Sequence, residues 1–282
     1  MKRRPPAHGG GRRVDLHTHT VFSDGHLTPE ALVEYAVRKG LAAVAITDHD
    51  SIEAFERAHV AAARRLEMVP GVEISSAVDG LDLHILGYFL DPEHEPLHRR
   101  LQAFQLERRR RAAQILDRLA ALGVRLDVDE IFAAAGPGVV GRPHVAAALV
   151  RSGAAVNMDD AFRRFLGAHG AAFVPRPAFH PQEAIALVHA ANGVSVLAHP
   201  GPQLLDVVIE RLVDVGLRGI EVWHPQHTPT TIRRYRALAE RLDLVETGGS
   251  DFHGPMQGTD LGDLDVPYGA LLRLKQAAGV AG

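Results

Sequence analysis

The chain is built around seven short apolar segments, and histidine or carboxylate residues stand in or directly after nearly all of them. Amphipathic stretches of helical length separate most of these segments. This alternation is typical of an α/β protein with a mainly parallel sheet. We therefore predict seven strands, at Arg13–His17, Ala42–Thr47, Met68–Ile74, Leu81–Leu90, Gly193–Ala198, Gly219–Trp223 and Leu244–Thr247.

The polar residues at the strand ends predict where a functional site would form. In a parallel barrel the carboxyl ends of all strands meet on one face, and that face holds the active site. Residues that lie far apart in the sequence are therefore expected to converge there. The segments concerned are Asp15–His19, Thr47–Asp50, Gly71–Glu73, Ala198–Pro200, Glu221–His224 and Gly249–His253, together with His84 inside the fourth strand.

Residues that favour helix ends mark several of the intervening helices. Thr28 suits an N-cap, Pro29 suits the first helical position, and Gly40 suits the end of the same helix. Pro181 and Thr228 mark the starts of two further helices. These signals agree with helices that alternate with the predicted strands.

The middle of the chain differs from the rest, because residues 91–179 contain no convincing strand. Their pattern predicts helices at about Glu95–Leu122, Asp129–Ala135, Arg142–Arg151 and Met158–Leu166. We expect a flexible basic tail at 1–13, a barrel formed by 14–90 and 180–282, and a helical insertion domain at 91–179.

Histidine is abundant, with 17 in 282 residues, and cysteine is absent. Without cysteine, disulfide scaffolds, thiolate zinc sites, iron–sulfur clusters and cysteine nucleophiles are excluded. The formal net charge of −3 does not suit a nucleic-acid coat protein, and we expect no binding to duplex DNA. No apolar run approaches the ~20 residues that span a bilayer, and the N-terminus has no apolar signal core. We therefore expect a cytoplasmic protein without a membrane partner.

The spacing of the strand-end residues favours metal binding. His17 and His19 are two residues apart, so on a strand both side chains point to the same side. Asp251 and His253 repeat that spacing if the chain stays extended. A carboxylate such as Glu73 can bridge two metal ions. One histidine at a strand end is more often structural than a ligand, but repetition at five strand ends favours divalent metal.

The strand-end motifs resemble those of the polymerase and histidinol phosphatase (PHP) family of metal-dependent phosphoesterases. The family fold is a distorted (β/α)7 barrel, which agrees with the seven predicted strands, and here a helical insertion domain would interrupt it. The matching motifs occur in the expected order over nearly the whole chain. They are DLHTH at 15–19, SDG at 23–25, ITDHD at 46–50, GVEIS at 71–75, AHPG at 198–201 and GSDFH at 249–253.

The resemblance implies two to three divalent metal ions, with manganese expected and iron or zinc as alternatives. Some relatives carry histidine at the position of Asp24, so the third ion is the one most open to variation. The implied ligands are His17, His19, Glu73 and Asp251 for one ion, Glu73, His84 and His199 for a second, and Asp24, His49 and His253 for a third.

Within the family, the segment between His84 and His199 resembles the branch of nucleoside 3',5'-bisphosphate phosphatases and 5'-to-3' exoribonucleases. The resemblance implies a hydrolase for a phosphate monoester of a nucleotide, with short 5'-phosphorylated RNA as a second substrate. In such a hydrolase metal-bound hydroxide attacks phosphorus. It also implies phosphate contacts from Arg142 and His144. Pro202 departs from the pattern, because relatives often carry arginine there.

A leaving alcohol needs a proton donor at the mouth of the site, and His227 or His224 could supply the proton. We expect His227 also to contact the substrate, and Asp24 to take part in catalysis through its metal ion.

Two other functions fit the same residues. A histidinol phosphate phosphatase would use the same metal ligands. An inactive PHP scaffold or nucleic-acid-binding module would keep the fold without hydrolysis, although intact ligand motifs argue against it. The sequence contains neither a G-x-S-x-G motif nor a P-loop, so it does not favour a serine hydrolase or a P-loop nucleotidase. It does not indicate an oligomeric state.

Three features near these motifs have alternative interpretations. The run Arg108–Arg111 predicts a solvated helix, with Arg108 or Arg111 turned toward the cleft as the alternative. Asp48 could orient a neighbouring ligand or cap the next helix. Asp50 is expected to be the N-cap of a helix that starts near Ser51.

Overall fold

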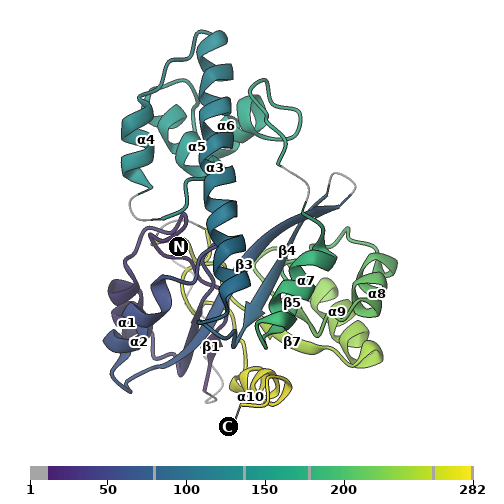
Figure 1. The fold of residues 1–282 in the computed structure, drawn as a ribbon. Coiled ribbons are helices and arrows are strands. Elements are labelled where there is room, and N and C mark those ends of the chain that lie inside the picture. The colour runs from purple at the N-terminus through teal and green to yellow at the C-terminus, as the bar shows by residue number, and fades with distance from the viewer. Residues whose placement is uncertain (1–11, 79–80, 136–137, 177–178, 256–257, 281–282) are drawn as a thin grey trace, which may run out of the picture.

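The computed structural model describes residues 12–78, 81–135, 138–176, 179–255 and 258–280. Its strands form one sheet in chain order, from β1 to β7 (Figure 1). Backbone hydrogen bonds from Leu16 N to Gly248 O, at 3.1 Å, and from His19 N to Phe252 O, at 2.9 Å, connect the first strand to the last. These bonds nearly close the sheet into a barrel. The strands are β1 Val14–Asp15, β2 Ala43–Ile46, β3 Glu67–Val78, β4 Leu81–Tyr88, β5 Val194–Leu197, β6 Gly219–Trp223 and β7 Val245–Gly248.

All seven predicted strands are present, but the fourth runs in the opposite direction to its neighbours. β4 pairs antiparallel with both β3 and β5, whereas the other neighbouring strands pair parallel. As a result, Ser75 on β3 pairs with His84 on β4. This reversal explains why His84 lies inside its strand and not at the carboxyl end.

Helices cover the outside of the barrel, with α1 and α2 on one side, α7, α8 and α9 on the other, and α10 below (Figure 1). The Thr28 side chain accepts a hydrogen bond from Ala31 N, and Gly40 has a φ of +70°, as its expected place at the end of the helix requires. Thr228 caps α9 in the same way, through Thr231 N. The helices are α1 Pro29–Arg38, α2 Ala54–Ala62, α7 Pro181–Ala190, α8 Asp206–Asp214, α9 Pro229–Leu242 and α10 Tyr268–Ala277.

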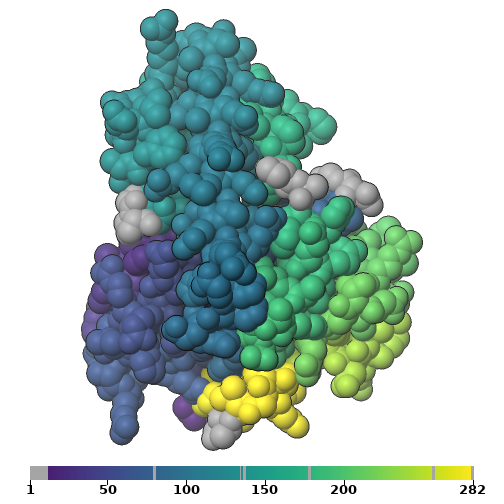
Figure 2. Space-filling model, viewed as in Figure 1, coloured from purple at the N-terminus to yellow at the C-terminus, as the bar shows by residue number. Residues whose placement is uncertain are grey.

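Between β4 and α7 the described residues contain helices but no strand, and this helical segment rises above the barrel (Figures 1 and 2). The first half of α3 packs on the barrel core through Leu97, Leu101 and Phe104. Its second half belongs to a separate apolar cluster that includes Ile115 and Leu149. We propose residues 91–179 as an insertion domain on this basis. Its helices are α3 Glu95–Ala121, α4 Val128–Ala134, α5 Arg142–Arg151, α6 Met158–Ala161 and the π-helix η1 Phe162–Leu166.

The expected basic tail begins outside the described residues, which start at Arg12. Arg12 and Arg13 are not part of a tail. The Arg12 guanidinium lies 3.9 Å from the centre of the Tyr268 ring, and Arg13 Nη1 donates to Gly262 O at 2.6 Å. The backbone carbonyl of Arg13 also accepts a hydrogen bond from Ala42 N, so strand pairing fixes this residue. None of the described helices is long and apolar enough to cross a membrane.

Candidate metal centre

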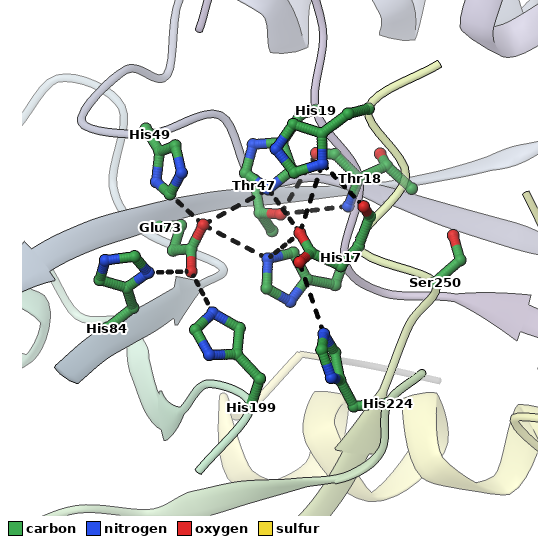
Figure 3. Close-up of polar contacts among 12 residues, drawn as sticks. His17, Thr18, His19, Thr47, His49, Glu73, His84, His199, His224 and Ser250 are labelled. Atoms are coloured by element: carbon green, nitrogen blue, oxygen red, sulfur yellow. Dashed lines mark hydrogen bonds and ion pairs between the residues drawn. The ribbon is translucent and has the colours of Figure 1, made fainter. Parts of the chain in front are cut away.

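Glu73 is buried at the centre of a group of histidines at the mouth of the barrel (Figure 3). Its side chain is only 1% exposed, although a carboxylate is normally left in water. Five imidazole nitrogens surround its two oxygens. Oε1 lies 2.7 Å from His84 Nδ1 and 2.9 Å from His199 Nε2, and Oε2 lies 3.0 Å from His49 Nδ1 and 3.4 Å from both His17 Nε2 and His19 Nε2.

Asp251 extends this group beyond His17 and His19. Asp251 Oδ1 lies 3.1 Å from His19 Nε2 and 3.4 Å from His17 Nε2. Its other oxygen, Oδ2, lies 3.4 Å from His224 Nε2.

Asp24 joins the group from the loop after β1. Asp24 Oδ1 lies 3.3 Å from His253 Nε2, and Asp24 Oδ2 lies 3.9 Å from His49 Nε2. The structure thus brings all nine residues expected as metal ligands into one connected group.

The backbone places these side chains in two different ways. His17 and His19 continue the line of β1, and their ring centres are 5.2 Å apart on the same side, as the two-residue spacing predicts. The expected extension between Asp251 and His253 is wrong, because Asp251 has a φ of +51°. A left-handed turn, not an extended strand, brings His253 Nε2 to Asp24. Gly249 is required beside it, since a Cβ there would lie 2.3 Å from His17 N.

Several polar atoms at the centre are buried without a hydrogen-bond partner among the described residues. They are His17 Nε2, Asp24 Oδ1, His49 Nδ1 and Glu73 Oε2. An unsatisfied buried polar atom costs about 1–3 kcal/mol, and more when the group is charged. Divalent cations bound at the centre would satisfy these atoms, and imidazole and carboxylate donors suit Mn, Fe or Zn.

Three sets of candidate ligand atoms lie close enough together to hold a metal ion, each with all its atoms within 4.8 Å of one another. His19 and His49 each belong to two sets, whereas the family resemblance gave each of them to one ion. The sets are His19, Asp24, His49 and His253; His17, His19 and Glu73; and His49, Glu73 and His84.

The carboxylates of the centre remain ionised despite their burial. Burial opposes the charge on Glu73, but His49, His84 and His17 hold its pKa well below the ordinary value. Burial likewise opposes the charge on Asp24, and His253 and His49 hold its pKa well below the usual range.

The ring of His19 is held in its neutral form. Burial and the nearby His253 ring lower the pKa of His19 to about 4, so it is neutral at pH 7. Neutral imidazole is the form that binds metal.

Asp48 supports a candidate ligand through the loop that follows β1. It accepts hydrogen bonds from Thr20 N at 2.7 Å, Thr20 Oγ1 at 2.6 Å and Ser23 Oγ at 2.6 Å. Ser23 Oγ in turn lies 3.3 Å from His19 Nδ1. Of the two alternatives for Asp48, the structure favours the one in which it orients a ligand.

The expected N-cap role of Asp50 is wrong. Helix α2 begins at Ala54, and Asp50 accepts hydrogen bonds from Ser75 N at 2.9 Å and Arg108 Nε at 2.7 Å. The reason is its φ of +53°, which turns the side chain away from the helix and toward α3.

A cavity of about 130 Å³ opens beside the centre, and four arginines line it. Arg108 pairs with Asp50, and Arg142 Nη2 lies 3.2 Å from Asp82 Oδ2. The other arginines, Arg111 and Arg176, have no carboxylate within salt-bridge distance among the described residues. Its lining residues include Asp24, His49, Asp82, His84, Arg108, Arg111, Arg142 and Arg176.

The positive charges of the cavity crowd one another. Burial and the nearby Arg142 and Arg176 lower the pKa of Arg111 to about 9. Burial and Arg108 lower the pKa of Arg176 to about 10. Sequence reasoning missed Arg176 altogether, because a single arginine in an irregular segment carries no local signal. Arg108 and Arg111 both line the cavity, which agrees with the alternative in which one of them faces the cleft.

Arg142 is the only one of the residues expected to contact substrate that lines this cavity. His144 Nδ1 accepts the Gly141 N–H at 3.1 Å, so it helps to start α5. His227 Nδ1 lies 2.9 Å from Val222 O, and its Nε2 accepts from Gly201 N at 3.2 Å. Both His227 nitrogens are thus engaged by the backbone, and the acid and substrate-binding roles expected for it stay predictions.

Comparison with known proteins agrees with the geometry of the centre. A family model described as the PHP domain matches residues 15–126. The 5'-3' exoribonuclease Rnm of Escherichia coli is 37% identical over 257 residues, which cover 88% of this chain and 87% of the relative. The chain belongs to the PHP domain family. As a PHP protein it is a metal-dependent phosphoesterase, an enzyme that hydrolyses phosphoester bonds.

Two further PHP relatives resemble the chain over nearly its whole length. The 3',5'-nucleoside bisphosphate phosphatase of Chromobacterium violaceum is 33% identical over 252 residues, with 87% of this chain and 88% of the relative covered. A crystal structure of a candidate metal-dependent phosphoesterase from Bifidobacterium adolescentis superposes with a TM-score of 0.88 at 34% identity. That superposition covers 97% of this chain and 98% of the other.

Proposed function

We propose that this PHP protein removes phosphate from a nucleotide that carries two phosphate groups, such as a nucleoside 3',5'-bisphosphate, and acts on short 5'-phosphorylated RNA as well. The observation that supports this proposal is the composition of the cavity, because candidate metal ligands and four arginines line it together. One phosphate would lie at the metal centre, and the second would lie against the arginines. Two of the named relatives, a nucleoside bisphosphate phosphatase and an exoribonuclease, support the same substrate class.

The charges of the cavity favour a second phosphate over an amine. Among the described residues Arg111 and Arg176 form no salt bridge, whereas Arg108 and Arg142 pair with Asp50 and Asp82. Guanidinium groups bind phosphate through paired, charge-assisted hydrogen bonds. Histidinol phosphate would bring an ammonium group to the same arginines, and the like charges would repel it. The arginines therefore favour the nucleotide over histidinol phosphate.

The nine clustered residues would hold two to three divalent ions, and manganese is the ion we propose. Such ions supply a nucleophile at neutral pH and offset charge on the phosphoryl oxygens when bound. Glu73 would be one of their ligands, because histidines surround both of its oxygens. Asp24, an ionised carboxylate that lines the cavity, would be another ligand.

We propose His224 as the proton donor to the leaving alcohol. Its Nδ1 accepts a hydrogen bond from Gln226 N at 3.3 Å, which leaves the proton on Nε2. That Nε2 lies 3.4 Å from Asp251 Oδ2, at the edge of the metal centre. His227 Nε2 accepts from the backbone and would be less able to donate.

Replacing His224 by Asn should slow hydrolysis of alkyl phosphates by about 10²-fold or more, since an acid contributes roughly 10²–10⁴ to such a step. Aryl phosphates, whose leaving groups need no proton, should change much less. The ratio of the two rates measures the effect, and His227→Asn is the matched control. A similar loss on both ester types in His224→Asn would argue against the acid role.

Phosphate release by the Mn-loaded protein tests the proposed function. The substrates are adenosine 3',5'-bisphosphate, AMP, histidinol phosphate and a short 5'-phosphorylated RNA, and His17→Ala is the blank. We expect the bisphosphate to give the highest kcat/KM and the blank to give almost none. Preference for histidinol phosphate would replace the proposal with the alternative phosphatase. Full metal content without release from any of the four would contradict it.

A further inference from the structure

The buried carboxylate of Glu221 contacts two candidate metal ligands at once. Glu221 lies on β6 and has no exposed surface. Its Oε1 lies 3.0 Å from His17 Nδ1, and its Oε2 accepts the backbone N–H of His199 at 2.7 Å. The register of β6 against β7 shifts between Glu221 and Trp223, and such a bulge re-aims the side chains beside it. Glu221 is not one of the nine residues that are expected to bind metal.

The contact with His17 fixes which of its ring nitrogens is free. Glu221 Oε2 already accepts the backbone N–H of His199, and Oε1 is the oxygen that faces His17. A carboxylate only accepts hydrogen bonds, so His17 Nδ1 must be the donor. The other nitrogen, Nε2, is buried without a hydrogen-bond partner and lies 3.4 Å from both Glu73 Oε2 and Asp251 Oδ1. His17 therefore presents the lone pair of Nε2 to the metal centre.

The contact with His199 stabilises a strained backbone conformation at that residue. His199 has a φ of +24°, a conformation that residues with a side chain rarely adopt. The hydrogen bond from its N–H to Glu221 Oε2 holds that peptide in place. In this conformation His199 Nε2 lies 2.9 Å from Glu73 Oε1, and its ring stacks on that of His17 with 5.6 Å between the ring centres (Figure 3).

We infer that Glu221 is a positioning residue that holds His17 and His199 in their metal-binding orientations at the same time. This inference rests on the proposed metal binding and adds a residue that touches no metal. Both partners donate hydrogen bonds to Glu221, so the residue at this position must supply two acceptor oxygens. Glutamine has one acceptor and one donor on its amide and can serve only one of the two partners. Aspartate has two oxygens but is shorter by one methylene.

The test compares metal binding by the wild-type protein, Glu221→Gln and the matched control Glu246→Gln. Glu246 also lies on a strand of the barrel, but its partners are Arg236 and Arg273 and it does not touch the centre. Titration calorimetry gives the Kd for Mn²⁺, and the visible spectrum of the Co²⁺-loaded protein reports ligand geometry. We expect Glu221→Gln to bind Mn²⁺ about 10- to 100-fold more weakly, with an altered Co²⁺ spectrum. The Glu246→Gln control should match the wild type in both.

The outcomes separate this inference from the proposed function. Wild-type protein that binds no metal would overturn both. Wild-type binding with an equal Kd and spectrum in folded Glu221→Gln would overturn only the role of Glu221. If Glu221→Gln does not fold, nitrogen NMR of the Zn-loaded wild type still decides the question. We expect a proton on His17 Nδ1 there, and a proton on Nε2 would overturn the inference.

Discussion

Among single residues, Arg176 shows most clearly why the cavity would attract an anion. Its Nη1 is buried without a hydrogen-bond partner among the described residues, while Arg108 and Arg142 have aspartate partners. Burial and Arg108 lower its pKa only to about 10, so the side chain keeps its charge at neutral pH. A bound phosphate would supply the missing partner and offset the crowded charge.

Replacing Arg176 by Ala should raise KM for adenosine 3',5'-bisphosphate by about 10- to 100-fold, because a hydrogen bond to a charged group contributes about 1.5–3 kcal/mol. KM for p-nitrophenyl phosphate, which has one phosphate, should change little. Steady-state kinetics on both substrates measures this difference. Arg109→Ala is the control, since Arg109 is exposed on α3. An equal rise in both KM values would mean that Arg176 acts on the centre as a whole.

Among the helices, α10 packs on the barrel through an apolar face that includes Leu271 and Leu274, and it also contacts one carboxylate on β3. Glu67 Oε2 accepts a hydrogen bond from the Tyr268 hydroxyl at 2.6 Å, and Glu67 Oε1 pairs with Lys275 Nζ. Both partners lie on α10, the last helix of the chain. Burial opposes the charge on Glu67, but Lys275 and Tyr268 hold its pKa below the ordinary value.

Because its pKa is lowered by folding, Glu67 stabilises the fold above the unfolded pKa and loses this effect as pH falls through the folded pKa. Glu67→Gln should lower the free energy of unfolding by about 1 kcal/mol at pH 7, since the pair is partly exposed. The difference should disappear in acid, below the pKa of Glu67. Urea unfolding at pH 7 and in acid measures this difference. The control is Glu210→Gln, which removes the exposed ion pair of Glu210 with Arg241. A difference that persists in acid would contradict this explanation.

At the scale of the whole molecule, the barrel mouth and the helical segment together enclose the site. The cavity takes Asp24, His49 and His84 from the barrel and Arg142 from α5 of the helical segment. The long helix α3 connects the two, because its first half packs on the barrel core and its second half on the helical core. Arg108, midway along α3, ties it to the loop that carries His49 through Asp50.

Metal removal should therefore weaken the whole fold and not only the centre. A ligand that binds only the folded state at 100 times its Kd stabilises it by about 2.7 kcal/mol per site. For a domain near this size, that corresponds to a shift in Tm of about 5 °C or more. Thermal unfolding with Mn²⁺ and with EDTA should differ by at least this amount, and His17→Ala should show a smaller difference. Equal Tm values with and without Mn²⁺ would contradict metal binding by the folded chain.

Local signals in the sequence were enough to predict the strands and several helix ends, and the resemblance to the PHP family supplied the set of nine candidate ligands. Short apolar runs and capping residues such as Thr28 and Thr228 act within a few residues of themselves. The strand-end rule then brings residues such as His17 and His199 together without any contact being known. These features depend on chain order and local geometry, which the sequence displays directly.

Contacts between distant segments were decided only by the tertiary structure. The reversed direction of β4, the turn at Asp251 and the pairing of Asp50 with Arg108 all depend on how segments pack across the barrel. The same is true of Arg176, which has meaning only beside the other cavity arginines, and of Glu221, whose two partners come from different strand ends. Which partner a buried charge meets is set by packing, because no local pattern specifies the side chains that surround it.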